Sequence, residues 1–189
     1  MTRWEPGARE RLNSAALELY ASKGFEETTV AEIAQAAGLT ERTFFRYFAD
    51  KREVLFAGSE LLEQQMLDGA AAAPKSATAF EVARAAVTAT AAYFPEDRRS
   101  YSRLRAKVIT ENPQLTEREL RKMSSLAEAI AAALRERGIP EPTATLAAQS
   151  GVTVFRVTFA GWISEGERRS FVEIETETFA QLGAMTAKG

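Results

Sequence analysis

Apolar residues recur three and four positions apart along almost the whole chain, which is the spacing of amphipathic helices. A first helix is predicted from about Pro6 to Ser22, where Gly24 ends it, and its apolar face is formed by Leu12, Ala15, Ala16 and Leu19. No turn dipeptide stands between alternating apolar and polar runs, as a β-hairpin requires. The pattern therefore predicts an all-α fold.

Two short helices are predicted next. Thr29 and Glu32 have the spacing of a capping box, which opens the second helix, and Gly38 ends it. Thr40 is placed to cap a third helix that reaches about Phe48. Two helices around a glycine-containing turn form either a plain αα-corner or a DNA-binding helix-turn-helix, and their spacing alone leaves both open.

Six more helices are predicted in the remainder, which gives about nine in all. Asp50 is expected to cap the fourth helix, and Thr116–Glu119 and Ser170–Glu173 are two further capping boxes. The expected ranges are about 51–67, 77–94, 95–111, 116–138, 142–165 and 170–185. We expect two parts, residues 1–50 and 51–189, joined through the fourth helix.

The composition narrows the chemistry. The chain contains no His and no Cys, which removes histidine bases, thiol nucleophiles and the usual zinc ligands. We therefore expect no enzyme, no cofactor and no metal. No apolar run approaches the roughly 18 residues of a membrane span, and the first residues lack a secretory pattern, so a cytoplasmic protein is expected.

Charge gives no support to nucleic-acid binding. The formal net charge is −2, whereas a dedicated DNA-binding module is usually basic. A larger protein can still present one DNA-binding face, so that face has to be found in a motif.

The third predicted helix carries such a face. Phe44 and Phe48, four residues apart, form one ridge that can dock on the preceding helices. The other ridges bring together Arg42, Arg46, Thr43 and Tyr47, with Phe45 between them. Arginines, hydroxyls and apolar atoms suit guanine, phosphate and the thymine methyl group in a major groove. Each residue alone is ordinary surface, but together they favour DNA binding.

The run Thr28–Lys51, TTVAEIAQAAGLTERTFFRYFADK, closely resembles the N-terminal signature of the TetR family of transcriptional regulators. Lys23-Gly24-Phe25 before it and Glu53-Val54-Leu55 after it match the same signature. The resemblance implies a homodimeric regulator, most often a repressor, that binds a near-palindromic double-stranded DNA operator and responds to a small effector.

The resemblance also assigns DNA contacts by position. It implies that the residues facing the bases or the groove wall are Glu41, Arg42, Thr43, Phe45 and Arg46. It implies that the residues binding phosphates are Thr28, Thr29, Tyr47 and Lys51. Glu41 departs in charge from the lysine often found at its position, so it either accepts from cytosine or points away.

The C-terminal part is expected to dimerise and to hold the effector. Two apolar stripes, Val152–Trp162 and Phe171–Met185, fit either an internal core or a four-helix dimer interface, and the resemblance favours the dimer. A pocket for a hydrophobic or acyl-like effector is expected among Tyr93, Phe94, Tyr101, Phe155, Phe159 and Trp162, with polar anchors from Arg103, Arg105, Asn112 and Arg156.

Two other functions stay open at this point. One is a TetR-like protein that binds DNA constitutively and has no effector. The other is an all-α enzyme whose N-terminal helices are only scaffold, although no compact catalytic motif is present in the sequence.

Overall fold

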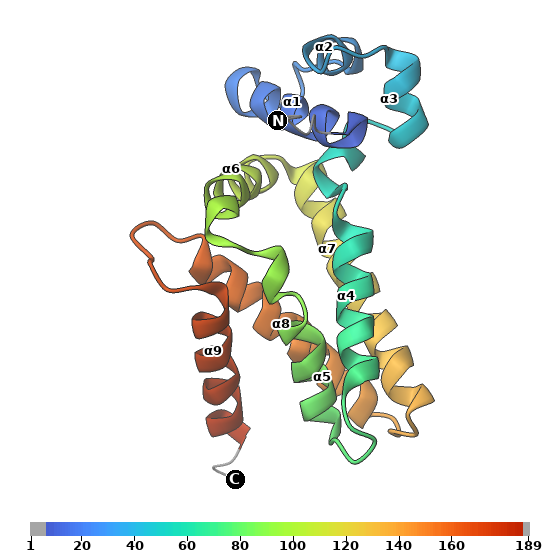
Figure 1. The fold of residues 1–189 in the computed structure, drawn as a ribbon, viewed down its shortest axis with the longest axis vertical. Coiled ribbons are helices and arrows are strands. Elements are labelled where there is room, and N and C mark those ends of the chain that lie inside the picture. Colours follow the sequence, from blue (N-terminus) through green and yellow to red (C-terminus); the bar gives the residue numbers. More distant parts are fainter. Residues whose placement is uncertain (1–6, 187–189) are drawn as a thin grey trace, which may run out of the picture. The chain divides into compact units, whose positions relative to one another are not determined.

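The computed structural model describes residues 7–186, which form nine α-helices and three short 3-10 helices without any strand in that range (Figure 1). This confirms the predicted all-α fold; the expected first helical residue, Pro6, lies outside the described residues. Within residues 7–186, no helix is both long enough and apolar enough to cross a membrane.

The chain divides into two compact units. The first contains the described residues up to Ser59 together with Leu104–Glu119, and the second contains Glu60–Arg103 and the described residues from Leu120 onward. We call the first unit the head. Two helices, α6 (Arg99–Thr110) and α7 (Pro113–Glu136), contribute residues to both units.

The head consists of α1 (Ala8–Lys23), α2 (Val30–Ala36), α3 (Glu41–Tyr47), the 3-10 helix η1 (Glu53–Phe56) and the adjoining ends of α6 and α7. Apolar side chains from each of these elements fill its core, among them the fully or almost fully buried Leu12, Phe25, Ile33, Phe44, Val54, Ile109 and Leu115. This burial fixes the positions of α2, α3 and η1, which are too short to be stable alone.

The fourth predicted helix starts later than the sequence suggests. Residues 53–56 form η1, and α4 runs over Ser59–Ala72. Asn13 Nδ2 donates to the carbonyl of Val54 at 2.6 Å, and Arg105 Nε donates to the carbonyl of Leu55 at 2.7 Å. These bonds tie the tighter 3-10 turn, which stands where the first turn of an α-helix is expected, to α1 and α6.

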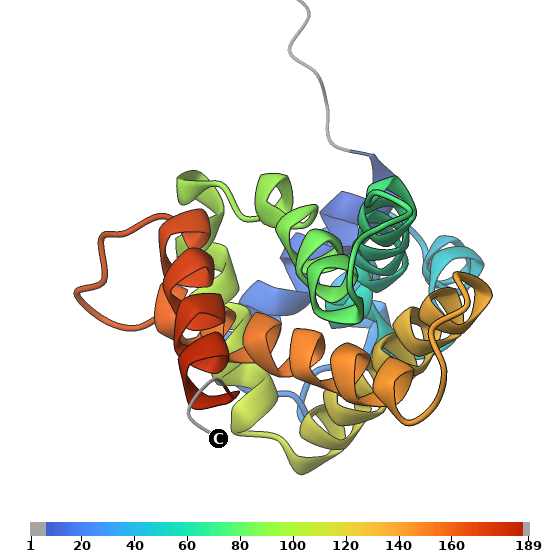
Figure 2. The same ribbon diagram turned by 90° about the horizontal axis from the view of Figure 1, so that it is seen from below.

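The second unit is built around α8 (Thr143–Trp162), which packs against α5 (Ala79–Thr88) and α9 (Phe171–Thr186) (Figures 1 and 2). Its continuous core also includes α4, α7 and the segment that contains the 3-10 helices η2 (Ala91–Tyr93) and η3 (Glu96–Arg98). The buried side chains of α7 in this core are Leu126, Ala127, Ile130, Ala131 and Leu134.

Two other predicted boundaries shift for local reasons. The helix expected over 77–94 ends at Thr88, and the hydroxyl of the buried Thr90 donates to the carbonyl of Val87 at 2.8 Å. Helix α7 begins at Pro113, so Thr116 lies inside it and donates to the carbonyl of Ile109 instead of capping. Proline suits a first helical position because its missing N–H is not needed there.

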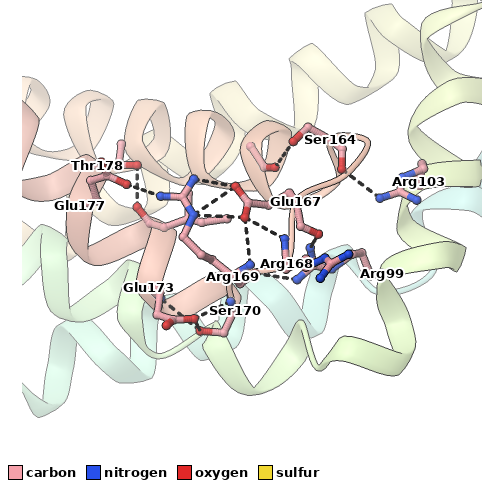
Figure 3. Close-up of polar contacts among 12 residues, drawn as sticks. Arg99, Arg103, Ser164, Glu167, Arg168, Arg169, Ser170, Glu173, Glu177 and Thr178 are labelled. Atoms are coloured by element: carbon pink, nitrogen blue, oxygen red, sulfur yellow. Dashed lines mark hydrogen bonds and ion pairs between the residues drawn. The ribbon is translucent and has the colours of Figure 1, made fainter.

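Arginines of α6 hold the loop between α8 and α9 (Figure 3). Arg103 Nε donates to the carbonyl of Ile163 at 2.7 Å and Arg103 Nη2 donates to that of Ser164 at 3.0 Å. Arg99 donates to the carbonyls of Glu167 and Arg169, each at 2.6 Å. The loop's own Glu167 carboxylate adds to this by accepting from the Arg168 and Arg169 N–H groups and pairing with the Arg169 guanidinium, so the loop is held both by α6 and by its own side chains.

Candidate nucleic-acid interface

Helix α2 begins with a complete capping box. The Glu32 N–H donates to Thr29 Oγ1 at 3.2 Å, and the Thr29 N–H donates to the Glu32 carboxylate at 2.9 Å, as the sequence predicts. Lys23 of α1 forms an ion pair with the same carboxylate. The hydrogen bond from Lys23, followed by those from Thr29, lowers the pKa of Glu32 to about 2. The entry of α2 is therefore tied to the end of α1.

The turn between α2 and α3 requires glycine. Gly38 has φ of 66°, which other residues rarely adopt, and its N–H donates to the carbonyl of Gln35 at 2.9 Å. The next N–H, of Leu39, donates to the carbonyl of Ala34 at 2.8 Å. Thr40 then caps α3 by accepting from the Thr43 N–H at 3.2 Å. These local bonds set the angle between the two helices.

One face of α3 is locked into the head. Phe44 is 0% exposed and Phe48 is 4% exposed, and their ring centroids are 5.5 Å apart. This confirms the predicted docking ridge, which leaves little freedom for α3 to rotate about its own axis.

The opposite face of α3 is in solvent. Glu41, Arg42, Phe45, Arg46 and Tyr47 are all exposed, and Phe45 exposes 55% of its surface. Within the described part of the chain, neither the Glu41 carboxylate nor the Arg42 guanidinium has a charged or hydrogen-bonded side-chain partner. An exposed aromatic ring beside charged groups without such partners is unusual for a surface that contacts only water.

The side chains of Arg46 and Tyr47 contact each other and so restrict each other's orientation. Arg46 Nη2 donates to the Tyr47 hydroxyl at 3.0 Å, and the guanidinium lies 4.9 Å from the centroid of the tyrosine ring. Thr43 lies half-exposed beside them, with its hydroxyl 3.0 Å from that of Thr40. Donors and acceptors are thus held on one side of a single short helix.

Two residues assigned to phosphates by resemblance are engaged inside the head. Thr28 is 1% exposed, and its hydroxyl donates to the carbonyl of Gly24 at 2.7 Å. Lys51 Nζ donates to the carbonyls of Phe25, Glu26 and Thr28 at 2.8 to 3.1 Å, which uses all three ammonium protons. The other phosphate candidates, Thr29 and Tyr47, are exposed.

The residues expected around an effector are only partly gathered. Phe155, Phe159 and Trp162 join Phe94 in one aromatic cluster of the second unit. Tyr93 also reaches this cluster, with its ring centroid 5.3 Å from that of Phe94, and its other contact is with Arg98, whose guanidinium carbon is 3.9 Å from the tyrosine ring centroid. The half-buried Tyr101 ring lies 5.9 Å from the same carbon.

The predicted polar anchors do not join this cluster. Arg105 belongs to the head, where it bonds to the Leu55 carbonyl and to Glu119, and Arg156 is exposed on α8. The cluster also contains Phe171 and Arg99, which the sequence pattern does not predict for this site. No pattern in the sequence indicates Arg99, because its burial depends on the distant α8–α9 loop.

Comparison with known proteins identifies both parts of the chain. Residues 12–57 match the family model described as bacterial regulatory proteins, tetR family, and residues 77–187 match the model described as the MftR C-terminal domain. TcmR of Streptomyces glaucescens, an HTH-type transcriptional regulator, is 42% identical over 59 residues, which cover 31% of this chain and 26% of TcmR. The curated relatives are thus matched over about a quarter to a third of their length.

Solved structures match over nearly the whole length. A TetR-family regulator of Syntrophomonas wolfei has a TM-score of 0.65 at 15% identity, with 95% of each chain covered. FadR of Thermus thermophilus, a TetR-family repressor solved in complex with lauroyl-CoA, has a TM-score of 0.50 at 26% identity, with 92% of each chain covered. Since the C-terminal family model alone matches more than half of the residues, the chain belongs to the TetR family of DNA-binding transcriptional regulators.

Proposed function

We propose that this regulator is a repressor that inserts α3 into the major groove of a near-palindromic operator and is released by a small apolar effector. The proposed DNA binding is supported by the difference between the two faces of α3. Phe44 and Phe48 fix one face, while the other presents uncommitted charged and aromatic groups to solvent.

The proposed base-facing residues are those at the exposed start and middle of α3: Glu41, Arg42, Thr43, Phe45 and Arg46. Thr29 and Tyr47 are proposed to bind phosphates, which position the helix without reading sequence. Thr28 and Lys51 are left out of this set, since their polar groups already serve the head. Their role is to hold the loop from which Thr29 projects.

A homodimer is proposed to form through α8 and α9. Leu146, Val157, Val172 and Met185 on these helices are large apolar side chains that expose 48 to 80% of their surface. A second copy of the same pair of helices would cover them in an isologous interface. Two-fold symmetry would then present two α3 helices to half-sites about 34–36 Å apart, one turn of DNA.

The effector is proposed to enter the aromatic cluster of the second unit. Its rings suit an apolar body, and the lauroyl-CoA in the structure of FadR is an acyl compound. Residues 1–50 would thus provide DNA binding, and residues 51–189 would provide dimerisation and effector binding. The proposal includes no catalytic step and places the protein in the cytoplasm, with the DNA it regulates.

Selection from random duplexes with the purified protein tests this function. We expect enrichment of a near-palindrome with half-sites one helical turn apart, and lower expression of a reporter placed behind that site when the protein is produced. A protein that enriches no sequence over a scrambled pool at low salt would contradict the proposal. Increased reporter expression would contradict only the assignment as a repressor.

A further inference from the structure

Arg99, at the start of α6, is a buried arginine in which one nitrogen, Nε, has no acceptor. The side chain is 4% exposed, and its Nη1 and Nη2 donate to the carbonyls of Glu167 and Arg169 (Figure 3). Nη2 also donates to the Glu96 carboxylate at 2.7 Å. The Arg99 Nε–H, however, is buried without an acceptor. Leaving a buried donor unpaired is unfavourable, and more so when the group is charged.

A second unused donor belongs to the neighbouring side chain. Trp162, the last residue of α8, is fully buried, and its Nε1–H also has no acceptor. The guanidinium carbon of Arg99 lies 5.2 Å from the centroid of the Trp162 ring, so the two side chains are in contact. Guanidinium and indole groups only donate, so neither can satisfy the other. This place in the second unit lacks an acceptor.

The surroundings of the two donors are aromatic. The Trp162 ring packs against Phe94, Phe159 and Phe171, with centroids 5.6 to 6.2 Å apart. Phe94 also stacks on Phe171 with a centroid separation of 4.6 Å. A ligand that satisfies this environment therefore combines an oxygen acceptor with an apolar body. A cationic head group is disfavoured by the buried charge of Arg99.

We propose that Arg99 and Trp162 form the head-group site of the effector, and that they bind a carboxylate or acyl carbonyl oxygen whose apolar chain lies among the phenylalanines. The inference rests on the proposed effector control. The two unused donors specify the head group, and the aromatic cluster specifies the body. Free fatty acids and acyl thioesters both have this chemistry, and they are separated by the test below.

A head-group series of constant chain length tests the site in the full-length protein. Trp4 and Trp162 are the only tryptophans, so in the Trp4→Phe variant the indole emission reports on Trp162 alone. Dodecanoate, dodecanoyl-CoA and dodecyltrimethylammonium are titrated in parallel. We expect a saturable emission change with the carboxylate, the thioester or both, and affinity at least about tenfold weaker for the cation.

Two variants separate the donors from the packing. Trp162→Phe keeps an aromatic ring but removes the N–H, and Arg99→Lys keeps the charge but removes Nε–H; binding to them is followed by calorimetry after a folding check by circular dichroism. For whichever probe binds the wild type, Trp162→Phe is expected to lower the affinity by about tenfold, and Arg99→Lys is expected to lower it by at least as much. Ser100→Ala, which removes an exposed hydroxyl from the same helix α6, is the matched control and should bind as the wild type does.

Several outcomes would overturn the site. They are equal binding of the anionic, carbonyl and cationic probes, unchanged affinity in Trp162→Phe, or no binding of any probe by the wild type. The last result together with normal operator binding would remove this site and leave the DNA-binding function intact. A wild-type protein that binds dodecanoate through these donors but selects no operator would instead contradict the proposed function alone.

Discussion

Lys51 and Arg42 are both cations of the head, but the structure uses them differently. Lys51 Nζ bonds to three carbonyls of the α1–α2 connection and lies 4.5 Å from the centroid of the Phe25 ring. Arg42 stands exposed on α3. The sequence motif contains both residues, but it does not show which cation is occupied, because the three carbonyls come from a segment more than twenty positions away.

This difference predicts separate effects on stability. Lys51→Ala removes three hydrogen bonds from a half-buried ammonium and should lower the free energy of unfolding by about 2 kcal/mol. Arg42→Ala, an exposed change, should alter it by less than about 0.5 kcal/mol. Urea denaturation followed by circular dichroism measures both. Equal stability of the two variants would show that the Lys51 bonds contribute nothing to the head.

Glu41 makes a second prediction at the scale of one residue. A free carboxylate that faces DNA is repelled by phosphates and can be accommodated best where it accepts from the exocyclic amine of cytosine. Glu41→Gln should move the preference at one position of each half-site from cytosine toward adenine, and Glu41→Ala should relax it. Binding to operators that carry each of the four bases there measures the change. An unaltered order of bases in both variants would mean that Glu41 points away from the groove.

At the scale of single elements, the sequence predicts best where the interactions are local. The caps at Thr29, Thr40 and Ser170 are found where expected, because each bond joins residues three positions apart. The capping-box pattern at Thr116 is not used, because α7 already begins at Pro113 and the Thr116 hydroxyl donates to the Ile109 carbonyl instead. The start of α4 is not predicted, because the side chain of Arg105, which bonds to the Leu55 carbonyl, comes from a distant helix.

The contact between α4 and α5 gives a prediction about packing. A Cβ atom added at Gly69 would lie 2.6 Å from both the Ala85 carbonyl oxygen and the Ala89 Cβ. Gly69→Ala should therefore destabilise the protein by about 1–3 kcal/mol, although alanine has the higher helix propensity. The neighbouring Asp68→Ala, at an exposed position of the same helix, should change stability by less than about 0.5 kcal/mol. Thermal unfolding distinguishes them, and a stabilised Gly69→Ala would show that α4 and α5 are not in close contact.

At the scale of the whole molecule, the resemblance predicts the family and the fold, but not how the chain is divided. Residues 104–119 belong to the head although about two fifths of the second unit, residues 60–103, precedes them in sequence. The contacts responsible include Arg118 with Glu53 and Gln114 with Glu26, pairs that no periodicity in the sequence can indicate. The effector cluster is missed in part for the same reason, since Arg99 and Phe171 come from separate elements.

The proposed dimer is tested by introducing a charged residue into the proposed interface. Val157→Asp places a carboxylate on the exposed apolar face of α8, whereas Leu120→Asp makes the same change at a similarly exposed position of α7. Sedimentation at micromolar concentration should show a monomer for Val157→Asp and a dimer for Leu120→Asp. Loss of bivalent attachment should also weaken operator binding by about 100-fold. A dimer that tolerates Val157→Asp would place the interface elsewhere.

The central claim, that the exposed face of α3 reads duplex DNA, is tested most directly by titrating arginine variants against the selected operator and a scrambled duplex at one fixed salt concentration. Arg42→Ala and Arg46→Ala should each weaken operator binding by about 1–3 kcal/mol and bring it closer to the affinity for the scrambled duplex. Arg121→Ala, an exposed arginine of α7 outside the head, serves as the control. Near-wild-type operator affinity in both folded α3 variants would contradict the account.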